Sequence, residues 1–156
     1  MPTIATLCYV IKHDKILLIK KKKGIGAGFW NGPGGKVEAG EAAEDAAKRE
    51  CYEEVGIIPE APAKVAELVF HYGEDEWVVH VFVADDYDGI ERETEEAVPK
   101  WFLLPKIPYE EMWPDDAIWL PLVLEGKKFT GVFRIDPDTK ALLSHEIKEI
   151  PDGSVV

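Results

Sequence analysis

The sequence predicts an α/β fold in which one mixed β-sheet is sandwiched between helices. Short apolar segments of strand length, many of them β-branched, dominate the chain, and only two segments have helical character. The two kinds of segment alternate too irregularly for a doubly wound fold, which favours a mixed sheet. A chain of 156 residues can bury about two thirds of its unfolded surface in one core, so we expect a single domain over residues 1–156.

The chain begins with two predicted strands. Residues 6–11 (TLCYVI) and 15–20 (KILLIK) are short apolar segments, and the polar residues between them have the composition of a hairpin turn. The following segment, residues 24–40, is dense in glycine, which favours close approach of the backbone to a ligand. We expect this segment to be a functional loop without regular structure.

A helix is predicted at residues 41–55, which are rich in helix-forming residues and are followed by Gly56, where a C-terminal glycine cap belongs. Ala47, Cys51 and Val55 are spaced at i, i+4 and i+8, so they should pack on the sheet. The other elements are predicted from their apolar patterns: strands at residues 65–72, 77–84, 101–104, 129–135 and 142–150, and a second helix at about 116–124.

The charge of the chain limits the functions it can have. It carries 30 acidic and 18 basic side chains, for a net charge of -12. Such a charge argues against binding of nucleic acid through the overall field, and it repels a polyanionic substrate. A nucleotide substrate would therefore need a local reversal of charge, for which the lysine run at residues 20–23 and bound divalent cations are the two candidates.

The cysteines and the N-terminal sequence indicate the cellular compartment of the protein. The chain has two cysteines, Cys8 and Cys51, with neither a Cys-x-x-Cys pair nor a disulfide framework. The N-terminus lacks the pattern of a secretion signal, and no apolar run approaches the length of a membrane span, about 20 residues. These features predict a protein of the reducing cytoplasm that has no membrane partner.

Three carboxylates share one face of the first predicted helix: Glu50, Glu53 and Glu54 fall within an arc of about 100°. Like charges at these spacings weaken a helix by roughly 0.2–0.5 kcal/mol per pair, so a cation among them would stabilise the arrangement. Oxygen ligands of this kind suit Mg²⁺ or Mn²⁺, which also bridge phosphate oxygens. A solvated acidic helix face is the alternative that these three residues alone leave open.

The surroundings of these acids form a motif. Residues 35–57 match the pattern G-x5-E-x7-R-E-U-x-E-E-x-G-U at every fixed position, with Cys51 at the first aliphatic position U. This stretch resembles the Nudix box. The resemblance implies an α/β/α sandwich with a mixed sheet and a catalytic loop-helix-loop, and a metal-dependent attack of water on a nucleoside diphosphate linked to another group.

The resemblance also implies roles for individual residues, carried over by position. Arg49 would orient the carboxylates, and Glu41 would support the loop. Family members differ in which carboxylate activates the water; Glu53 is the favoured base and Glu54 the alternative. The implied ligands of Mg²⁺, or of Mn²⁺ in its place, are the Gly35 carbonyl, Glu50, Glu53, Glu54 and, from a loop outside the motif, Glu96.

A narrower resemblance runs through nearly the whole chain, to the mammalian-type oxidised purine nucleoside triphosphate hydrolases. Residues 24–37 and 112–116 carry it, followed by residues 127–129. It implies hydrolysis of substrates such as 8-oxo-dGTP or 2-hydroxy-dATP to the monophosphate and pyrophosphate. We expect the protein to act as a monomer, without a nucleic-acid partner. The implied substrate-binding residues are Thr6, Lys21, Asn31, Phe70, Tyr72, Trp113, Asp115 and Asp116.

These residue types suit a purine base. Trp113 offers an aromatic face for stacking, and Asn31 offers both a donor and an acceptor. Adjacent aspartates near apolar residues cannot both ionise cheaply, so Asp115 and Asp116 should share one proton and read the base. The alternative is a core tryptophan followed by aspartates that cap the second helix.

Two other kinds of function stay open. Within the enzyme class, the substrate could be another nucleoside diphosphate derivative, such as ADP-ribose, a dinucleoside polyphosphate or capped RNA. Outside it, the chain could be a nucleotide-binding regulator that has lost turnover. The intact set of Glu50, Glu53 and Glu54 favours an enzyme.

Overall fold

The computed structural model describes residues 1–151 and 154–156. Its helices are α1 (Ala43–Val55) and α2 (Asp116–Leu124), with two short 3-10 helices, η1 (Leu104–Lys106) and η2 (Tyr109–Glu111). The strands are β1 (Thr3–Lys12), β2 (Lys15–Lys21), β3 (Trp30–Asn31), β4 (Gly34–Lys36), β5 (Ile57–Pro59), β6 (Ala63–Tyr72), β7 (Asp75–Ala84), β8 (Tyr87–Gly89), β9 (Ala97–Leu103), β10 (Lys128–Ile135) and β11 (Leu142–Ile150).

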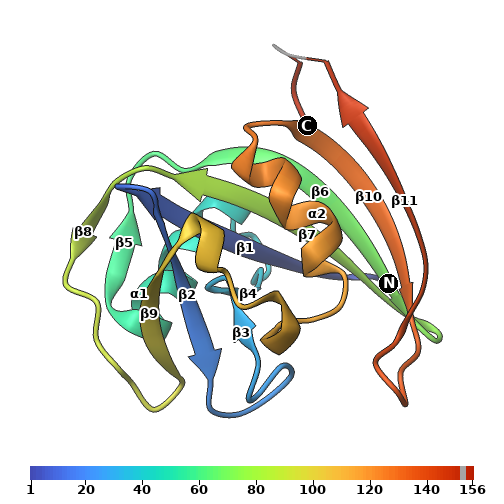
Figure 1. Cartoon of the computed structure of the whole chain (residues 1–156), viewed down its shortest axis with the longest axis horizontal. Coiled ribbons are helices and arrows are strands. Elements are labelled where there is room, and N and C mark those ends of the chain that lie inside the picture. The colour runs from blue at the N-terminus through green and yellow to red at the C-terminus, as the bar shows by residue number, and fades with distance from the viewer. Residues whose placement is uncertain (152–153) are drawn as a thin grey trace.

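A mixed sheet of nine strands forms the centre of the described structure, in the order β11-β10-β6-β7-β1-β2-β3, with β4 paired to β1 and β9 to β2 (Figure 1). Strands β1 and β7 run parallel, as do β6 and β10, whereas the hairpins β1–β2, β6–β7 and β10–β11 are antiparallel. The first hairpin turns at His13 and Asp14, whose φ angles of 54° and 60° match the twist of the flanking strands. The predicted mixed sheet is confirmed.

One helix covers each face of the sheet (Figure 1). Side chains alternate along β1, so Cys8 and Val10 pack in the core beneath α1, while Ala5 and Tyr9 pack in the core beneath α2. Each helix buries one apolar face, and each therefore needs its own face of the sheet. The result is the α/β/α sandwich that the sequence predicts.

Helix α1 confirms the first predicted helix. Ala47, Cys51 and Val55 are fully buried against the sheet. Gly56 ends the helix with a φ of 80°, and its N–H donates to the Tyr52 carbonyl at 2.9 Å. Glycine adopts this left-handed conformation without the clash that a Cβ would cause. With its apolar face fixed on the sheet, α1 turns its acids toward the glycine-rich segment.

The prediction that residues 24–40 lack regular structure is wrong for β3 and β4. Glycine here permits strand pairing rather than preventing it. A Cβ built on Gly34 would lie 1.9 Å from the Thr6 carbonyl oxygen, so only glycine brings β4 this close to β1. The first part of the segment is the expected loop, in which Gly24, Gly26 and Gly28 all have positive φ.

The strand predicted at residues 101–104 is longer than the sequence indicates. It begins at Ala97, and Leu104 already belongs to η1. Antiparallel pairing with β2, which matches Ala97 to Lys21 and Leu103 to Lys15, extends β9 through a proline. The other predicted strands and the second helix agree with β6, β7, β10, β11 and α2 to within a few residues at each end.

Candidate active site

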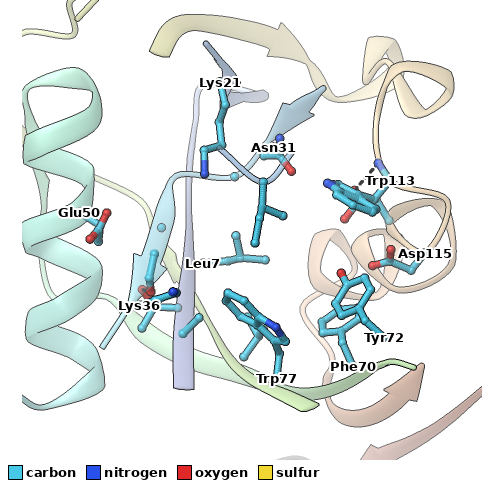
Figure 2. A pocket seen from close by; sticks show the side chains of 18 of the residues that line it. Leu7, Lys21, Asn31, Lys36, Glu50, Phe70, Tyr72, Trp77, Trp113 and Asp115 are labelled. Atoms are coloured by element: carbon cyan, nitrogen blue, oxygen red, sulfur yellow. Dashed lines mark hydrogen bonds between the residues drawn. The ribbon is translucent and has the colours of Figure 1, made fainter. Parts of the chain in front are cut away.

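A cavity of about 800 Å³ opens between the central sheet, the glycine-rich segment and α2. Figure 2 shows Glu50 of α1 at one end of it and Trp113 with Asp115 at the other, with Lys21 and Asn31 pointing in from between these ends. The structure therefore brings together elements from the whole length of the chain. The eight residues that the sequence predicts to bind substrate all line this cavity: Thr6, Lys21, Asn31, Phe70, Tyr72, Trp113, Asp115 and Asp116.

The end of the cavity next to α1 is acidic. Glu50 and Glu54 line it together with Glu96, which directly precedes β9. The backbone N–H of Lys22 donates to the Glu96 carbonyl at 2.9 Å, so the pairing of β2 with β9 fixes this acid near the helix. Glu93 of the same acidic run pairs instead with the Lys22 side chain. Of the run, Glu96 is thus the acid that lines the cavity.

Glu54 is the most enclosed acid at this end, with 3% of its surface exposed, and its Oε1 accepts a 2.8 Å hydrogen bond from the backbone N–H of Gly34. Its pKa is raised to about 8, mainly by burial and further by Glu50 and Glu96, against the lowering effects of the Gly34 N–H and Lys21. The pKa of Glu50 is also raised, mainly by burial. A cation between these acids would relieve their repulsion.

Arg49 joins the helix to the loop. Its Nε donates to Glu41 Oε2 at 2.8 Å, and its Nη2 donates to Glu41 Oε1 and to the Lys36 carbonyl, both at 3.0 Å. Its Nη1 donates to Glu50 Oε1 at 2.8 Å and to Glu53 Oε2 at 3.3 Å. The hydrogen bonds that Arg49 donates to Glu41 lower the pKa of Glu41 to about 2. The network has the geometry that an orienting role for Arg49 requires.

The residues at this end offer the ligands that a divalent cation needs. The Glu50 carboxylate lies against the backbone of Gly35, where a Cβ would come within 2.5 Å of Glu50 Oε2. Glu53 does not line the cavity; it is half exposed and turned toward Arg49. Within residues 1–151 and 154–156, no three acidic, histidine or cysteine side chains are grouped closely enough to hold a metal ion as they stand. Arg49 donates hydrogen bonds to both Glu50 and Glu53, two of the acids whose oxygens are of the kind that Mg²⁺ and Mn²⁺ prefer.

The opposite end of the cavity holds two buried aspartates. Asp115 Oδ2 accepts a 2.7 Å hydrogen bond from Trp119 Nε1, and Asp116 Oδ2 accepts one of 3.1 Å from the backbone N–H of Trp113. Burial raises the pKa of both, and the charge of Asp115 raises that of Asp116 further. Asp115 occupies the N-cap position of α2 without a capping hydrogen bond from its side chain, so the capping alternative is wrong for Asp115.

Aromatic side chains form the walls around these aspartates. The Trp113 ring lies 5.4 Å from that of Phe29 and 6.1 Å from that of Tyr72, measured between centroids, and Phe70 stacks on Tyr72 at 6.3 Å. Asn31 Nδ2 donates to the Phe29 carbonyl at 3.0 Å, which fixes the amide at the cavity wall. A planar apolar ring with polar edges fits such surroundings.

The lysine run separates into two pairs. Lys21 and Lys23 line the cavity, between the acidic end and the aromatic end, as the sequence predicts for Lys21. Lys22 pairs with Glu93 outside it, and the Lys20 ammonium lies 5.8 Å from the ring centroid of Trp30. Alternation at the end of β2 directs Lys20 and Lys21 to opposite sides of the strand, and Lys22 and Lys23 follow the strand.

Sequence reasoning missed several residues of the cavity, among them Tyr9, Trp77 and Trp119. Trp119 follows Asp115 by four residues, one turn of α2, and this spacing could have indicated the contact. Tyr9 lies on β1 and Trp77 lies on β7. The apolar pattern of a strand predicts which face of the sheet a side chain is on, but not which distant residues it contacts there. Only the sheet order brings them to the base of the cavity.

Comparison with known proteins agrees with this geometry. The family model of the NUDIX domain matches residues 1–123. The chain belongs to the Nudix family. Members of this family generally require a divalent metal ion and act on small-molecule nucleotide derivatives.

Two named relatives and one solved structure cover nearly the whole chain. The chain is 45% identical over 147 residues to the oxidized purine nucleoside triphosphate hydrolase of Mus musculus, covering 93% of this chain and 94% of the mouse protein. It is 42% identical over 151 residues to the protein of the same name from Danio rerio, covering 96% of each. The crystal structure of a MutT protein from Bacillus halodurans superimposes with a TM-score of 0.82 at 30% identity, over 93% of this chain and 97% of that one.

Glu54→Gln should stabilise the metal-free protein at pH 8. The pKa of Glu54 in the folded state, about 8, lies above its ordinary value of 4.5. Its contribution to the free energy of unfolding is therefore fully present below pH 4.5 and is lost as the pH rises through 8. Glutamine keeps an acceptor oxygen for the Gly34 N–H and has no charge to bury. In EDTA, the variant should melt at a higher temperature than the wild type at pH 8, and the difference should shrink toward pH 5.

The matched control is Glu44→Gln, which neutralises an exposed acid on the same helix. It should show no pH-dependent gain in melting temperature. Equal melting temperatures of wild type and Glu54→Gln at pH 8 would mean that Glu54 is not penalised by burial.

Proposed function

We propose that this protein hydrolyses oxidised purine nucleoside triphosphates, such as 8-oxo-dGTP or 2-hydroxy-dATP, to the monophosphate and pyrophosphate, and so sanitises the nucleotide pool. One observation carries the proposal: a single cavity of about 800 Å³ joins an acidic end, lined by Glu50, Glu54 and Glu96, to an aromatic end with two buried aspartates. The names of the relatives from mouse and zebrafish support the same substrate class.

The acidic end would hold Mg²⁺, or Mn²⁺ in its place, through Glu50, Glu53, Glu54, Glu96 and the Gly35 carbonyl. Bound there, the cation would neutralise the polyphosphate and lower the pKa of an attacking water. Arg49 would keep the acids aligned, and Glu53 or Glu54 would accept the proton of that water. Lys21 and Lys23 line the cavity, where their positive charge would attract the phosphates.

The aromatic end would read the base. Trp113 would stack on the ring, with Phe70, Tyr72 and Thr6 lining the pocket. Asp115 and Asp116 would share one proton, since both pKa values are raised by burial and the pair cannot ionise cheaply. A pair that both donates and accepts can bind two oxidised purines whose edges carry different donor patterns. Asn31 would add an amide contact.

The proposal extends to the state of the protein in the cell. We propose one domain over residues 1–156 that acts as a monomer in the cytoplasm, without a nucleic-acid or membrane partner. Cys8 and Cys51 are both free and buried, which fits a reducing compartment. No helix in the described part of the chain is long and apolar enough to cross a membrane.

A substrate panel tests the proposal. Purified protein with Mg²⁺ should release pyrophosphate and a monophosphate from oxidised purine triphosphates faster than from their normal parents, and EDTA should abolish turnover. Preference for ADP-ribose, a dinucleoside polyphosphate or capped RNA would place the enzyme elsewhere in the family. Binding without turnover would indicate a nucleotide-binding regulator. Release of orthophosphate as the first product would indicate a phosphatase. Hydrolysis in metal-free buffer would contradict the proposed metal site.

Glu53→Gln should fold but lose at least about 10²-fold in turnover, because it removes a ligand charge and the favoured base. The measurement is kcat at saturating Mg²⁺, with folding checked by circular dichroism and Glu44→Gln as the control. A kcat within a few fold of the wild type would exclude Glu53 from the mechanism. Glu54→Gln in the same assay compares the two candidate bases.

Asp116→Asn should lower kcat/KM by about 5- to 150-fold and change the ratio between 8-oxo-dGTP and 2-hydroxy-dATP. The amide keeps the shape of the side chain but cannot exchange a proton with Asp115, so one base edge is left mispaired. Steady-state kinetics on both substrates give the ratio. An unchanged ratio with unchanged kcat/KM would leave Asp116 only its structural contact with Trp113.

A further inference from the structure

The phenol of Tyr9 lies at the wall of the cavity and takes part in none of the contacts proposed above. It lies on β1, 1% exposed, on the face of the sheet that α2 covers. Its ring packs edge-on against Trp119, with 6.0 Å between centroids and 62° between planes. Trp119 in turn donates to Asp115. The phenol is therefore held rigidly beside the aspartate pair.

The position of the hydroxyl group follows from Gly32. A Cβ built on Gly32 would lie 3.1 Å from the Tyr9 hydroxyl oxygen and 2.6 Å from the ring. The phenol thus ends against the backbone next to Asn31, while Asp115 and Asp116 are near enough to act on its charge. Asn31, Asp115 and Asp116 line the same cavity as Tyr9.

This hydroxyl group has no partner within the described part of the protein. Each aspartate already accepts a hydrogen bond from a tryptophan, and Asn31 has committed one amide hydrogen to the Phe29 carbonyl. A hydroxyl at the cavity wall that has no protein partner is free to donate to a bound ligand. Burial, Asp116 and Asp115 raise the pKa of Tyr9 well above its ordinary value, so the hydroxyl keeps its proton and stays a donor.

We propose that the Tyr9 hydroxyl determines specificity by donating a hydrogen bond to an exocyclic carbonyl oxygen of the bound purine. The inference rests on the proposed function and adds a recognition group to that site. An oxo group on a base needs a donor, and Tyr9 adds one to the shared proton proposed for the aspartate pair and to the second amide hydrogen of Asn31. Tyr9 provides a neutral donor that costs no charge burial.

Tyr9→Phe tests the inference, because it keeps the ring against Trp119 and removes one oxygen. Three pairs of triphosphates isolate the exocyclic oxygen: 8-oxo-dGTP and dGTP, 2-hydroxy-dATP and dATP, dITP and dATP. For at least one pair, the ratio of kcat/KM should fall about 3- to 10-fold, through KM with kcat unchanged, since the base lies away from the reacting phosphates. These ratios do not depend on the fraction of protein that is folded.

A second readout needs neither metal nor turnover. Calorimetric Kd values of the matching monophosphates in EDTA should show the same loss of discrimination. Tyr52→Phe, which removes a half-exposed phenol oxygen on α1, is the matched control and should leave every ratio unchanged.

The outcomes separate this inference from the proposed function. A wild type that discriminates within these pairs, together with a Tyr9→Phe variant that keeps all ratios, would overturn the role of Tyr9 alone. A wild type that neither hydrolyses purine triphosphates nor binds their monophosphates would overturn the proposed function, and the role of Tyr9 with it.

Discussion

The close approach of the glycine-rich segment to its surroundings sets the geometry of the cavity. At Gly34 the backbone of β4 meets the backbone of β1, and at Gly35 it meets the Glu50 carboxylate. Between β3 and β4, the backbone of Gly32 meets the Tyr9 ring. A Cβ at these positions would come within 1.9, 2.5 and 2.6 Å of its neighbour. The absence of three side chains therefore lets β1, the Glu50 carboxylate and the Tyr9 ring all approach this one segment of backbone.

This packing also explains how a strongly acidic protein can receive a polyanion. The net charge is -12, yet Lys21 and Lys23 line the cavity, and Arg49 pairs with Glu50 and Glu53 of the acidic cluster. The charges that oppose the phosphates are those that a divalent cation would engage. Local arrangement, rather than net charge, decides what the cavity can bind.

The same arrangement costs stability. Glu54, Asp115 and Asp116 are carboxylates buried with raised pKa values, each satisfied by only one or two hydrogen bonds. Burial of such groups weakens the folded state, and local rules of folding are broken most often at functional sites. That these three lie at the two ends of one cavity is a strong physical argument that it is the active site.

Local periodicity made much of the protein predictable. Apolar spacing in residues 41–55 gave helix α1 with its buried face, and the same geometry put Glu50, Glu53 and Glu54 on the other side. The mixed sheet and most strands followed from short apolar segments. The motif and its wider resemblance then named eight residues that do share one cavity.

Long-range pairing decided the rest. The sequence by itself determined the faces of its helices and strands, because a face depends on the spacing of neighbouring residues. It did not determine that β9 would pair with β2 and bring Glu96 to α1, or that Tyr9 would meet Trp119. It also gave no sign that Arg49 would hold Glu53 away from the cavity. These contacts depend on strand order, register and the space left by glycine, and such quantities exist only when distant segments are packed together.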